Sequence, residues 1–135
     1  VKALILVFFV QSIMTLIDYI IIMILEGGIK MIKQTAGRDQ LGKLAPNFAH
    51  YNDDILFGEN WNDTSIDLKT RCIITVVSLM SMGITDNSLM YHLENAKKNG
   101  ISKEEMVGIV THVAFYAGWP KAWAVFNLLK EVYKD

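Results

Sequence analysis

Apolar residues recur at three- and four-residue spacings through most of the chain after Met31, and this helical spacing is the strongest constraint on the fold. No stretch alternates apolar and polar residues between turn residues, as a half-buried strand would. Asp67 and Asp86 stand where helix N-caps are expected. Gly83 and Gly118 stand where helices are expected to end. The sequence therefore predicts an all-α domain.

Turn and capping residues interrupt this pattern and divide the domain into successive helices. We expect a short helix before Pro46 and a longer one from Pro46 to Phe57, followed by a polar loop over Gly58 to Ser65. The later helices are expected over 68–82, from the Asp86 cap to Gly100, from a Ser102 capping box to Ala117, and from Pro120 to Val132. Residues 72–82 are nearly all apolar, so this helix is expected to be buried on most of its sides.

The first thirty residues differ from the rest in composition. Residues 3–25 are almost entirely apolar and long enough to span the hydrocarbon core of a bilayer. Asp18 opposes insertion, although its many apolar neighbours would outweigh one carboxylate. A membrane is therefore an expected partner only if this segment belongs to the native protein.

A second interpretation of the same segment comes from the genetic code. The codons for residues 26–28, Glu-Gly-Gly, can contain the purine-rich sequence that bacterial ribosomes bind just before a start codon. Met31 follows within a few codons and could be that start. Our hypothesis is that residues 1–30 are translated upstream sequence and that the functional domain comprises residues 31–135. A genuine membrane anchor is the alternative.

Composition excludes several classes of partner and site. Thirteen Lys and Arg oppose fourteen Asp and Glu, so there is no basic surplus with which to bind nucleic acid. One cysteine cannot form an intramolecular disulfide, a Cys-x-x-Cys pair or a cysteine-based zinc site, and this favours the reducing cytoplasm. A domain this short cannot cover so many apolar helix faces by itself, which predicts a symmetric homo-oligomer.

A carboxylate, an imidazole and a phenol share one stripe of the predicted helix that starts at Ser102. Glu105, His112 and Tyr116 are seven and four residues apart, which places them on one face at about 100° per residue. In one interpretation Glu105 completes a capping box with Ser102 and the two rings are core or interface residues. In the other interpretation the stripe is catalytic.

His92 on the preceding helix is the second imidazole of interest. It lies one turn after Leu89, at the edge of the apolar stripe, so we expect it to share a cavity with His112. Imidazoles titrate at about pH 6.5 and therefore suit general acid and base catalysis. A metal site would need a carboxylate as third ligand, and no His-x-x-x-His pair on one helix supports it, so no metal is expected.

Arg71, Cys72 and Trp119 are further candidates, each with a structural alternative. Arg71 is suited to hold a substrate carboxylate, or it is a solvated surface charge. The neighbouring Cys72 would be reactive if the guanidinium lowered its pKa, but a small apolar filler is the simpler interpretation. Trp119 belongs to an aromatic turn that serves either packing or the wall of a small-molecule pocket.

Three motifs follow one another in the second half of the chain. They are His92-x-x-x-Ala96-x-x-x-Gly100, then Glu104-Glu105, then Tyr116-x-Gly118-x-Pro120-x-Ala122. Together they resemble the carboxymuconolactone decarboxylase family, and their order is more specific than any one of them. The likeness covers roughly residues 35–133.

The resemblance implies the all-α fold of alkyl hydroperoxidase D-like proteins, assembled as trimers or hexamers. It implies two chemistries. The decarboxylase branch removes CO₂ from a carboxylated muconolactone without a cofactor, whereas the peroxidase branch uses a Cys-x-x-Cys pair followed by a histidine. Counted back from His92, that pair would fall on Thr85 and Ser88, so disulfide-cycling chemistry is not expected. His112 stands where decarboxylases of the family often carry another residue.

These observations lead to one hypothesis and two rivals. We expect a cytoplasmic, cofactor-free homo-oligomer that acts as a lyase on a small carboxylated lactone. The rivals are a peroxide-reducing enzyme that depends on Cys72 and a non-catalytic oligomer that binds a small molecule. The catalytic candidates are His92, His112, Arg71, Tyr116 and Glu105, and the substrate-binding candidates are Trp119 and Cys72.

Overall fold

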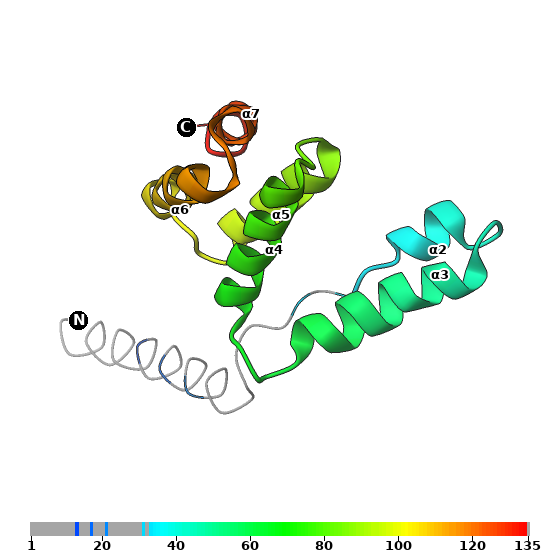
Figure 1. The fold of residues 1–135 in the computed structure, drawn as a ribbon. Helices are drawn as coiled ribbons and strands as arrows, with labels where there is room; N and C mark the ends of the chain where they lie inside the picture. The colour runs from blue at the N-terminus through cyan, green and yellow to red at the C-terminus, as the bar shows by residue number, and fades with distance from the viewer. Residues whose placement is uncertain (1–12, 14–16, 18–20, 22–30, 32, 135) are drawn as a thin grey trace, which may run out of the picture. The chain divides into compact units, whose positions relative to one another are not determined.

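The computed structural model is helical, and it describes Ile13, Ile17, Ile21, Met31 and residues 33–134 (Figure 1). No strand occurs in this described part, so the predicted all-α class is confirmed. The chain divides into two compact units, with the boundary in the sequence between Thr64 and Ser65, and each unit is described separately below.

The two hypotheses about residues 1–30 fall on a segment of which only the three isoleucines are described. Both hypotheses therefore concern residues outside the described structure. Among the described helices, none combines the length and apolar character needed to cross a membrane.

Unit 1 is built from short helical elements. They are α2 (Ala36–Leu41), α3 (Pro46–His50), the π-helical η1 (Tyr51–Glu59) and the 3₁₀ turn η2 (Asn60–Asn62). Proline occupies the start of α3, as predicted, because its fixed φ and missing N–H suit a first helical turn.

The predicted loop after Phe57 is wrong in its first half, because helical structure continues to Asn62. The Asn62 side chain donates hydrogen bonds to the carbonyl oxygens of Gly58 at 2.9 Å and Phe57 at 3.3 Å. The Phe57 and Trp61 rings also stack with centroids 6.0 Å apart. These contacts satisfy the carbonyl groups at the end of the helix, which sequence composition alone could not reveal.

A buried carboxylate joins α2 to η1. Asp53 is fully buried, and it accepts hydrogen bonds of 2.9 Å from the backbone N–H groups of Gly37 and Arg38 and from the Asn52 side chain. Burial acts to raise the Asp53 pKa, but these three hydrogen bonds and the Arg38 charge outweigh it and hold the pKa below its usual value. Asp53 is therefore a buried anion held by oriented donors.

With Asp53 on the buried face of α3 and η1, most of the large apolar residues of these two helices point away from the interior of unit 1. The buried positions of α3 and η1 are Ala49, Asp53 and Phe57, one turn apart. The apolar series that predicted the helix lies on the exposed side and consists of Leu44, Phe48, Tyr51, Ile55 and Leu56. The spacing thus predicted helical structure correctly, although Tyr51–Glu59 is π-helical, but it could not say which face is buried.

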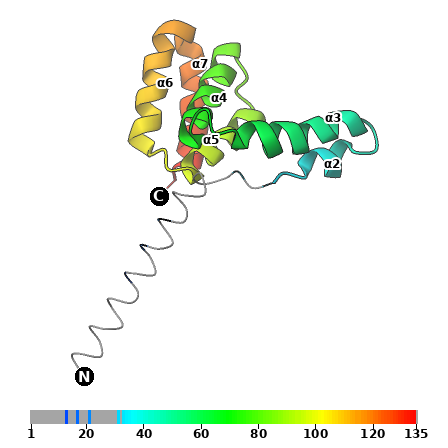
Figure 2. The ribbon, with the colours of Figure 1, turned by 90° about the horizontal axis from the view of Figure 1, so that it is seen from below.

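Unit 2 is a four-helix assembly in which two helices each contact all the others. It consists of α4 (Leu68–Met82), α5 (Asn87–Lys98), α6 (Lys103–Ala117) and α7 (Trp119–Val132). Helix α4 packs against α5, α6 and α7, and α7 also packs against α5 and α6 (Figures 1 and 2). The predicted limits of these helices are confirmed to within a residue or two.

Capping side chains set the beginnings of three of these helices, as the sequence predicts. Asp67 accepts a 2.9 Å hydrogen bond from the Thr70 N–H, and Asp86 accepts one of 2.9 Å from the Ser88 N–H. Ser102 and Glu105 form a reciprocal capping box at the start of α6. These caps satisfy N–H groups that have no partner within the helix.

The prediction that α4 is buried on most sides is wrong for the chain by itself. Cys72, Val76 and Met80 are fully buried at one-turn intervals, whereas Ile74 and Met82 are exposed. The neighbouring helices cover one face of α4 and leave the other open. Helix α4 therefore has more apolar surface than the other helices of the same chain cover.

Replacement of Gly37 by alanine tests the Asp53 junction. An added Cβ would lie 2.6 Å from Asp53 Oδ1 and 3.0 Å from the Ala49 carbonyl oxygen, so the junction must open. We expect Gly37→Ala to lower the free energy of unfolding by about 1–3 kcal/mol, the usual cost of overpacking. Urea denaturation followed by circular dichroism measures it.

Gly108→Ala is the matched control, because a Cβ there meets nothing within 4 Å on the surface of α6. Helix propensity predicts a gain of about 0.5–1 kcal/mol for this variant. Equal stability of the two variants would show that the junction tolerates an extra methyl group.

Candidate functional site

His92 occupies a half-buried position on α5. It lies at the edge of a stripe whose members Leu89, Leu93 and Ala96 are fully buried, as the spacing predicts. Its ring and the Tyr91 ring form a T-shaped pair, with centroids 5.0 Å apart and an interplanar angle of 79°. Burial lowers the pKa of His92 below its ordinary value, so the imidazole is neutral near pH 7. A neutral imidazole can donate a hydrogen bond from one ring nitrogen and accept one, or a proton, at the other.

The first turns of α4 bring the Cys72 thiol towards α5, the helix that carries His92. Cys72 is fully buried, and the Asn95 side-chain nitrogen lies 3.8 Å from its sulfur. Asn95 is one turn beyond His92 on α5 and is itself buried. Burial, and to a smaller extent the charge of Cys72, raises the pKa of Tyr91, whose ring contacts that of His92. Tyr91, His92, Asn95 and Cys72 are here called the α4–α5 cluster.

Asn95 and Tyr91 were not among the residues predicted for the site. The sequence does carry a signal for Asn95, because it is a polar residue within the apolar stripe of α5. Its amide also accepts a 3.1 Å hydrogen bond from Asn99 at the end of the helix. Tyr91 appears in the sequence only as the neighbour of His92.

Burial removes the reactivity that a neighbouring guanidinium would have given Cys72. It raises the pKa of the thiol to about 11, with a further small contribution from Asp67. The adjacent Arg71 is half-buried and donates a 3.3 Å hydrogen bond to the Ser65 hydroxyl. Cys72 is thus protonated near neutral pH, which matches its interpretation as an apolar filler.

Glu105 joins α6 to α4. Its carboxylate accepts a 2.8 Å hydrogen bond from the Ser102 N–H and forms a 2.7 Å ion pair with Lys69 of α4. The hydrogen bond from Lys69 is the largest cause of a lowered Glu105 pKa. The carboxylate is therefore ionised and engaged in positioning the start of α6, and a catalytic role for it stays a prediction.

His112 and Tyr116 lie on the outer face of α6. Their ring centroids are 5.2 Å apart, and both residues are exposed, Tyr116 by 81%. The opposite face of α6 supplies the buried residues, among them Met106 and Val110. The chain therefore places His112 with Tyr116, as the spacing predicts, while His92 lies half-buried on another helix. Convergence of the two imidazoles in one cavity stays a prediction.

Trp119 begins α7 and lines a hollow between α6 and α7. The hollow has a volume of about 370 Å³, within the size range of small-molecule pockets. Its walls come from Thr111, Ala114, Trp119, Ala122, Trp123, Phe126 and Lys130. Trp119 also meets Phe115 edge to face at 5.7 Å between ring centroids. The aromatic turn therefore lines a pocket, and substrate binding there stays a prediction.

Among the described residues, no three histidine, cysteine, aspartate or glutamate side chains gather in an arrangement that could hold a metal ion.

A known protein family matches the part of the sequence that contains these motifs. The model of the carboxymuconolactone decarboxylase family matches residues 46–131, from the start of α3 almost to the end of α7. The chain belongs to this family. The match includes His92, His112 and the whole α4–α5 cluster.

One relative with an assigned activity is recognisable at the sequence level. The chain is 27% identical over 115 residues to a 4-carboxymuconolactone decarboxylase of Acinetobacter baylyi. The aligned part covers 80% of this chain and 85% of the relative. The likeness therefore spans most of both proteins, which supports decarboxylase-like function at the level of the family.

The lowered pKa of His92 predicts how stability depends on pH. The unfolded chain takes up a proton on this imidazole near its ordinary pKa of about 6.5, whereas the folded chain does so only at lower pH. Between these values the unfolded state binds more protons, so the free energy of unfolding falls as the pH drops below about 6.5. Above that pH, His92 adds no pH dependence.

Urea denaturation at pH 7.5 and 5.5, compared between the wild type and His92→Gln, measures this contribution. We expect a smaller loss of stability in the variant, because glutamine does not titrate. The carboxylates with lowered pKa values titrate below this window and leave the difference unaffected. Identical pH dependence in the two proteins would contradict the burial of His92.

Proposed function

We propose that the protein is a cofactor-free carboxy-lyase that removes CO₂ from a small carboxylated lactone. The observation that carries the proposal is His92, a half-buried imidazole with a lowered pKa in a motif of the family. The named activity of the Acinetobacter relative supports the reaction type.

The reaction needs a group that returns a proton to carbon. When the bond to the carboxylate breaks, CO₂ leaves and the electron pair stays on the carbon, where the conjugated lactone carbonyl can delocalise it. A proton from imidazolium then replaces the lost CO₂, so one carboxylate and one proton become one C–H bond and CO₂. A histidine with a lowered pKa is a stronger acid in its protonated form and suits this transfer.

The substrate carboxylate also needs a cationic or donor-rich environment. Arg71 lies one residue before Cys72, so it stands at the same end of α4 as the α4–α5 cluster. Its guanidinium is suited to bind a carboxylate through two parallel hydrogen bonds. We assign Arg71 to carboxylate binding and the amide of Asn95 to positioning within the cluster.

The thiol alternative is disfavoured by the same geometry. Peroxide reduction by Cys72 requires a thiolate with access to peroxide. Cys72 is 1% exposed, and burial raises its pKa to about 11. The two features together leave little reactive thiolate near neutral pH.

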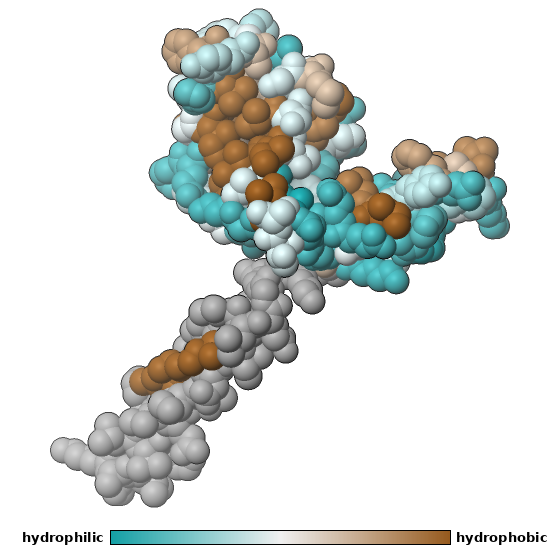
Figure 3. Space-filling model, turned by 60° about the horizontal axis from the view of Figure 1, so that its bottom comes forward, coloured by the Kyte–Doolittle hydropathy of each residue, from teal (hydrophilic) through white to brown (hydrophobic). Residues whose placement is uncertain are grey.

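We further propose that another copy of the chain covers the outer face of α6. Phe115 and Tyr116 are 77% and 81% exposed there, and a broad apolar area lies on the face of unit 2 that Figure 3 presents. Monomers seldom expose large apolar patches, and closed homo-oligomers commonly cover them. In such an assembly His112 and Tyr116 would lie at the interface, where the neighbouring copy supplies the missing wall of a site.

Substitution of His92 tests the lyase proposal. We expect His92→Gln to lower kcat about a hundredfold or more, the usual contribution of a general acid, on the lactone that the wild type decarboxylates fastest. In the wild type, kcat/KM should decline with rising pH and have its midpoint below the ordinary histidine pKa of about 6.5. A panel of carboxylated lactones with CO₂ detection measures both.

His50→Gln is the matched control, because His50 pairs with Asp54 in unit 1 and has no place in the proposed site. It should keep wild-type turnover. Full activity of His92→Gln would exclude the acid role. Loss of peroxide consumption in Cys72→Ala would support the thiol rival instead. Saturable ligand protection against heat without turnover would support the binding protein.

The assembly proposal has its own test. Phe115→Glu places a charge on the exposed face of α6 and should dissociate the oligomer, as measured by sedimentation velocity. Lys98→Glu, on the exposed side of α5, should leave it intact. If His112 acts at the interface, Phe115→Glu also lowers turnover. A wild-type protein that sediments as a monomer would overturn this part of the proposal.

A further inference from the structure

The groove between α6 and α7 contains two adjoining hollows. One has a volume of about 460 Å³ and is lined by Lys103, Val107, Phe126, Leu129, Lys130, Tyr133 and Lys134. The other is the hollow of about 370 Å³ at Trp119. Phe126 and Lys130 line both, so the hollows are neighbours along one groove. We call it the α6–α7 groove.

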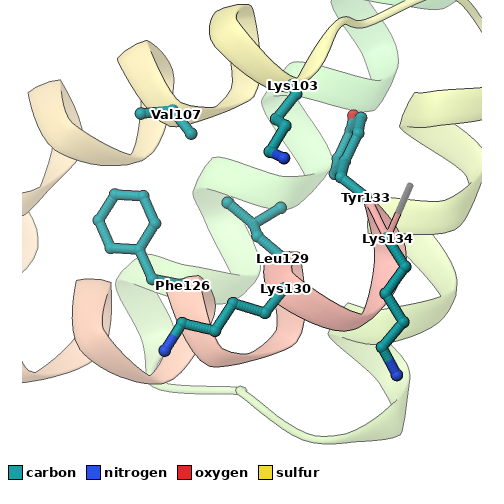
Figure 4. A pocket seen from close by; sticks show the side chains of 7 residues that line it. All are labelled: Lys103, Val107, Phe126, Leu129, Lys130, Tyr133 and Lys134. Atoms are coloured by element: carbon teal, nitrogen blue, oxygen red, sulfur yellow. The ribbon is translucent and has the colours of Figure 1, made fainter.

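The first hollow combines a cationic rim with an apolar floor. Figure 4 shows the Lys103 side chain reaching from α6 into the space beside Leu129. Lys130 and Lys134 line the other side, at and after the end of α7, and in this view their side chains run away from Lys103. The Phe126 ring and the Val107 side chain stand between the two helices. Such a surface is complementary to an anion attached to an apolar body.

The ammonium groups differ in how far they are already neutralised. Lys134 pairs with Glu131, and Lys130 makes one long contact of 3.4 Å to the Asn127 side chain. Within residues 33–134, Lys103 Nζ has no hydrogen bond or ion pair of its own. Its charge contributes only weakly to the lowered pKa of Glu104, which hydrogen bonds to the backbone and Ser102 chiefly cause. Lys103 is therefore the group most available to an incoming anion.

The second hollow has a different character. Trp119 and Trp123 are 54% and 62% exposed and form its walls with alanine and threonine side chains. Large exposed indole rings bind apolar groups well, because they bury much area at little cost in side-chain entropy. The groove thus changes along its length from a cationic end to an aromatic end.

We propose that the α6–α7 groove binds a medium-chain aliphatic carboxylate. The carboxylate pairs with Lys103, with Lys130 as a second cation, and the chain runs over Phe126 towards Trp119 and Trp123. On α6 the groove extends from Lys103 to Thr111, eight residues or about 12 Å of helix, which an undecanoate chain matches in length. This site is separate from the α4–α5 cluster, and its test does not use turnover.

Brominated fatty acids test both binding and direction, because bromine quenches tryptophan emission only at close range. Undecanoate with bromine on its terminal carbon should quench saturably, since the bromine reaches Trp119 and Trp123. The isomer with bromine next to the carboxylate should bind equally well but quench much less. The full chain is used, and the double variant Trp119→Phe/Trp123→Phe should lose the quenching while the emission of Trp61 in unit 1 remains.

Lys103→Met tests the anionic end. It removes the charge and keeps an apolar stem, so we expect about fivefold weaker binding, as one partly exposed ion pair contributes. Lys98→Met on α5 is the matched control and should bind as the wild type does. The bromoalcohol of the same length should bind equally to the wild type and to Lys103→Met, because it has no charge to lose.

Three results would overturn the proposal. Equal quenching by the two isomers would mean that the ligand has no fixed direction. Equal affinity of Lys103→Met and Lys98→Met for undecanoate would show that the carboxylate does not pair with Lys103. Saturable quenching that appears only when Phe115→Glu dissociates an oligomer would show that a second copy of the chain occupies the groove.

Discussion

Burial of one face of α4 is the constraint on which unit 2 depends. Cys72, Val76 and Met80 project from this face, and α5, α6 and α7 all pack against α4. Because α5 carries His92 and α6 carries His112, the positions of both imidazoles follow from how these helices pack on α4. The Lys69–Glu105 ion pair adds a polar link between α4 and the start of α6. The candidate chemistry therefore rests on a buried face of α4 whose thiol, Cys72, is kept protonated by its burial.

Unit 1 is organised around a different interaction. The Asp53 carboxylate is buried, and the backbone N–H groups of Gly37 and Arg38 bind it. A buried anion is tolerated only where donors replace its lost hydration, so this contact fixes α2 against η1. The exposed apolar residues on the other face, such as Phe48 and Tyr51, are then left for contacts beyond unit 1.

At the candidate site, helical spacing in the sequence predicts some features, and the packing of neighbouring helices decides others. The stripe of Glu105, His112 and Tyr116 follows from helical spacing, and the structure has the His112 and Tyr116 rings in contact. Spacing could not show that this stripe faces outward, because the buried face of α6 is set by its neighbours. The same reason explains why Asn95 was missed, since its importance arises from Cys72 on another helix.

The sequence by itself determined the helical class, the capped helix starts at Asp67, Asp86 and Ser102, and the family. These properties are local, because a cap or a motif is formed by residues within a few positions of one another. Tertiary structure decided which polar groups are buried, which apolar faces stay exposed and which carboxylates are paired. The buried Asp53 and the protonated Cys72 depend on atoms brought from distant parts of the chain, and no local pattern encodes them.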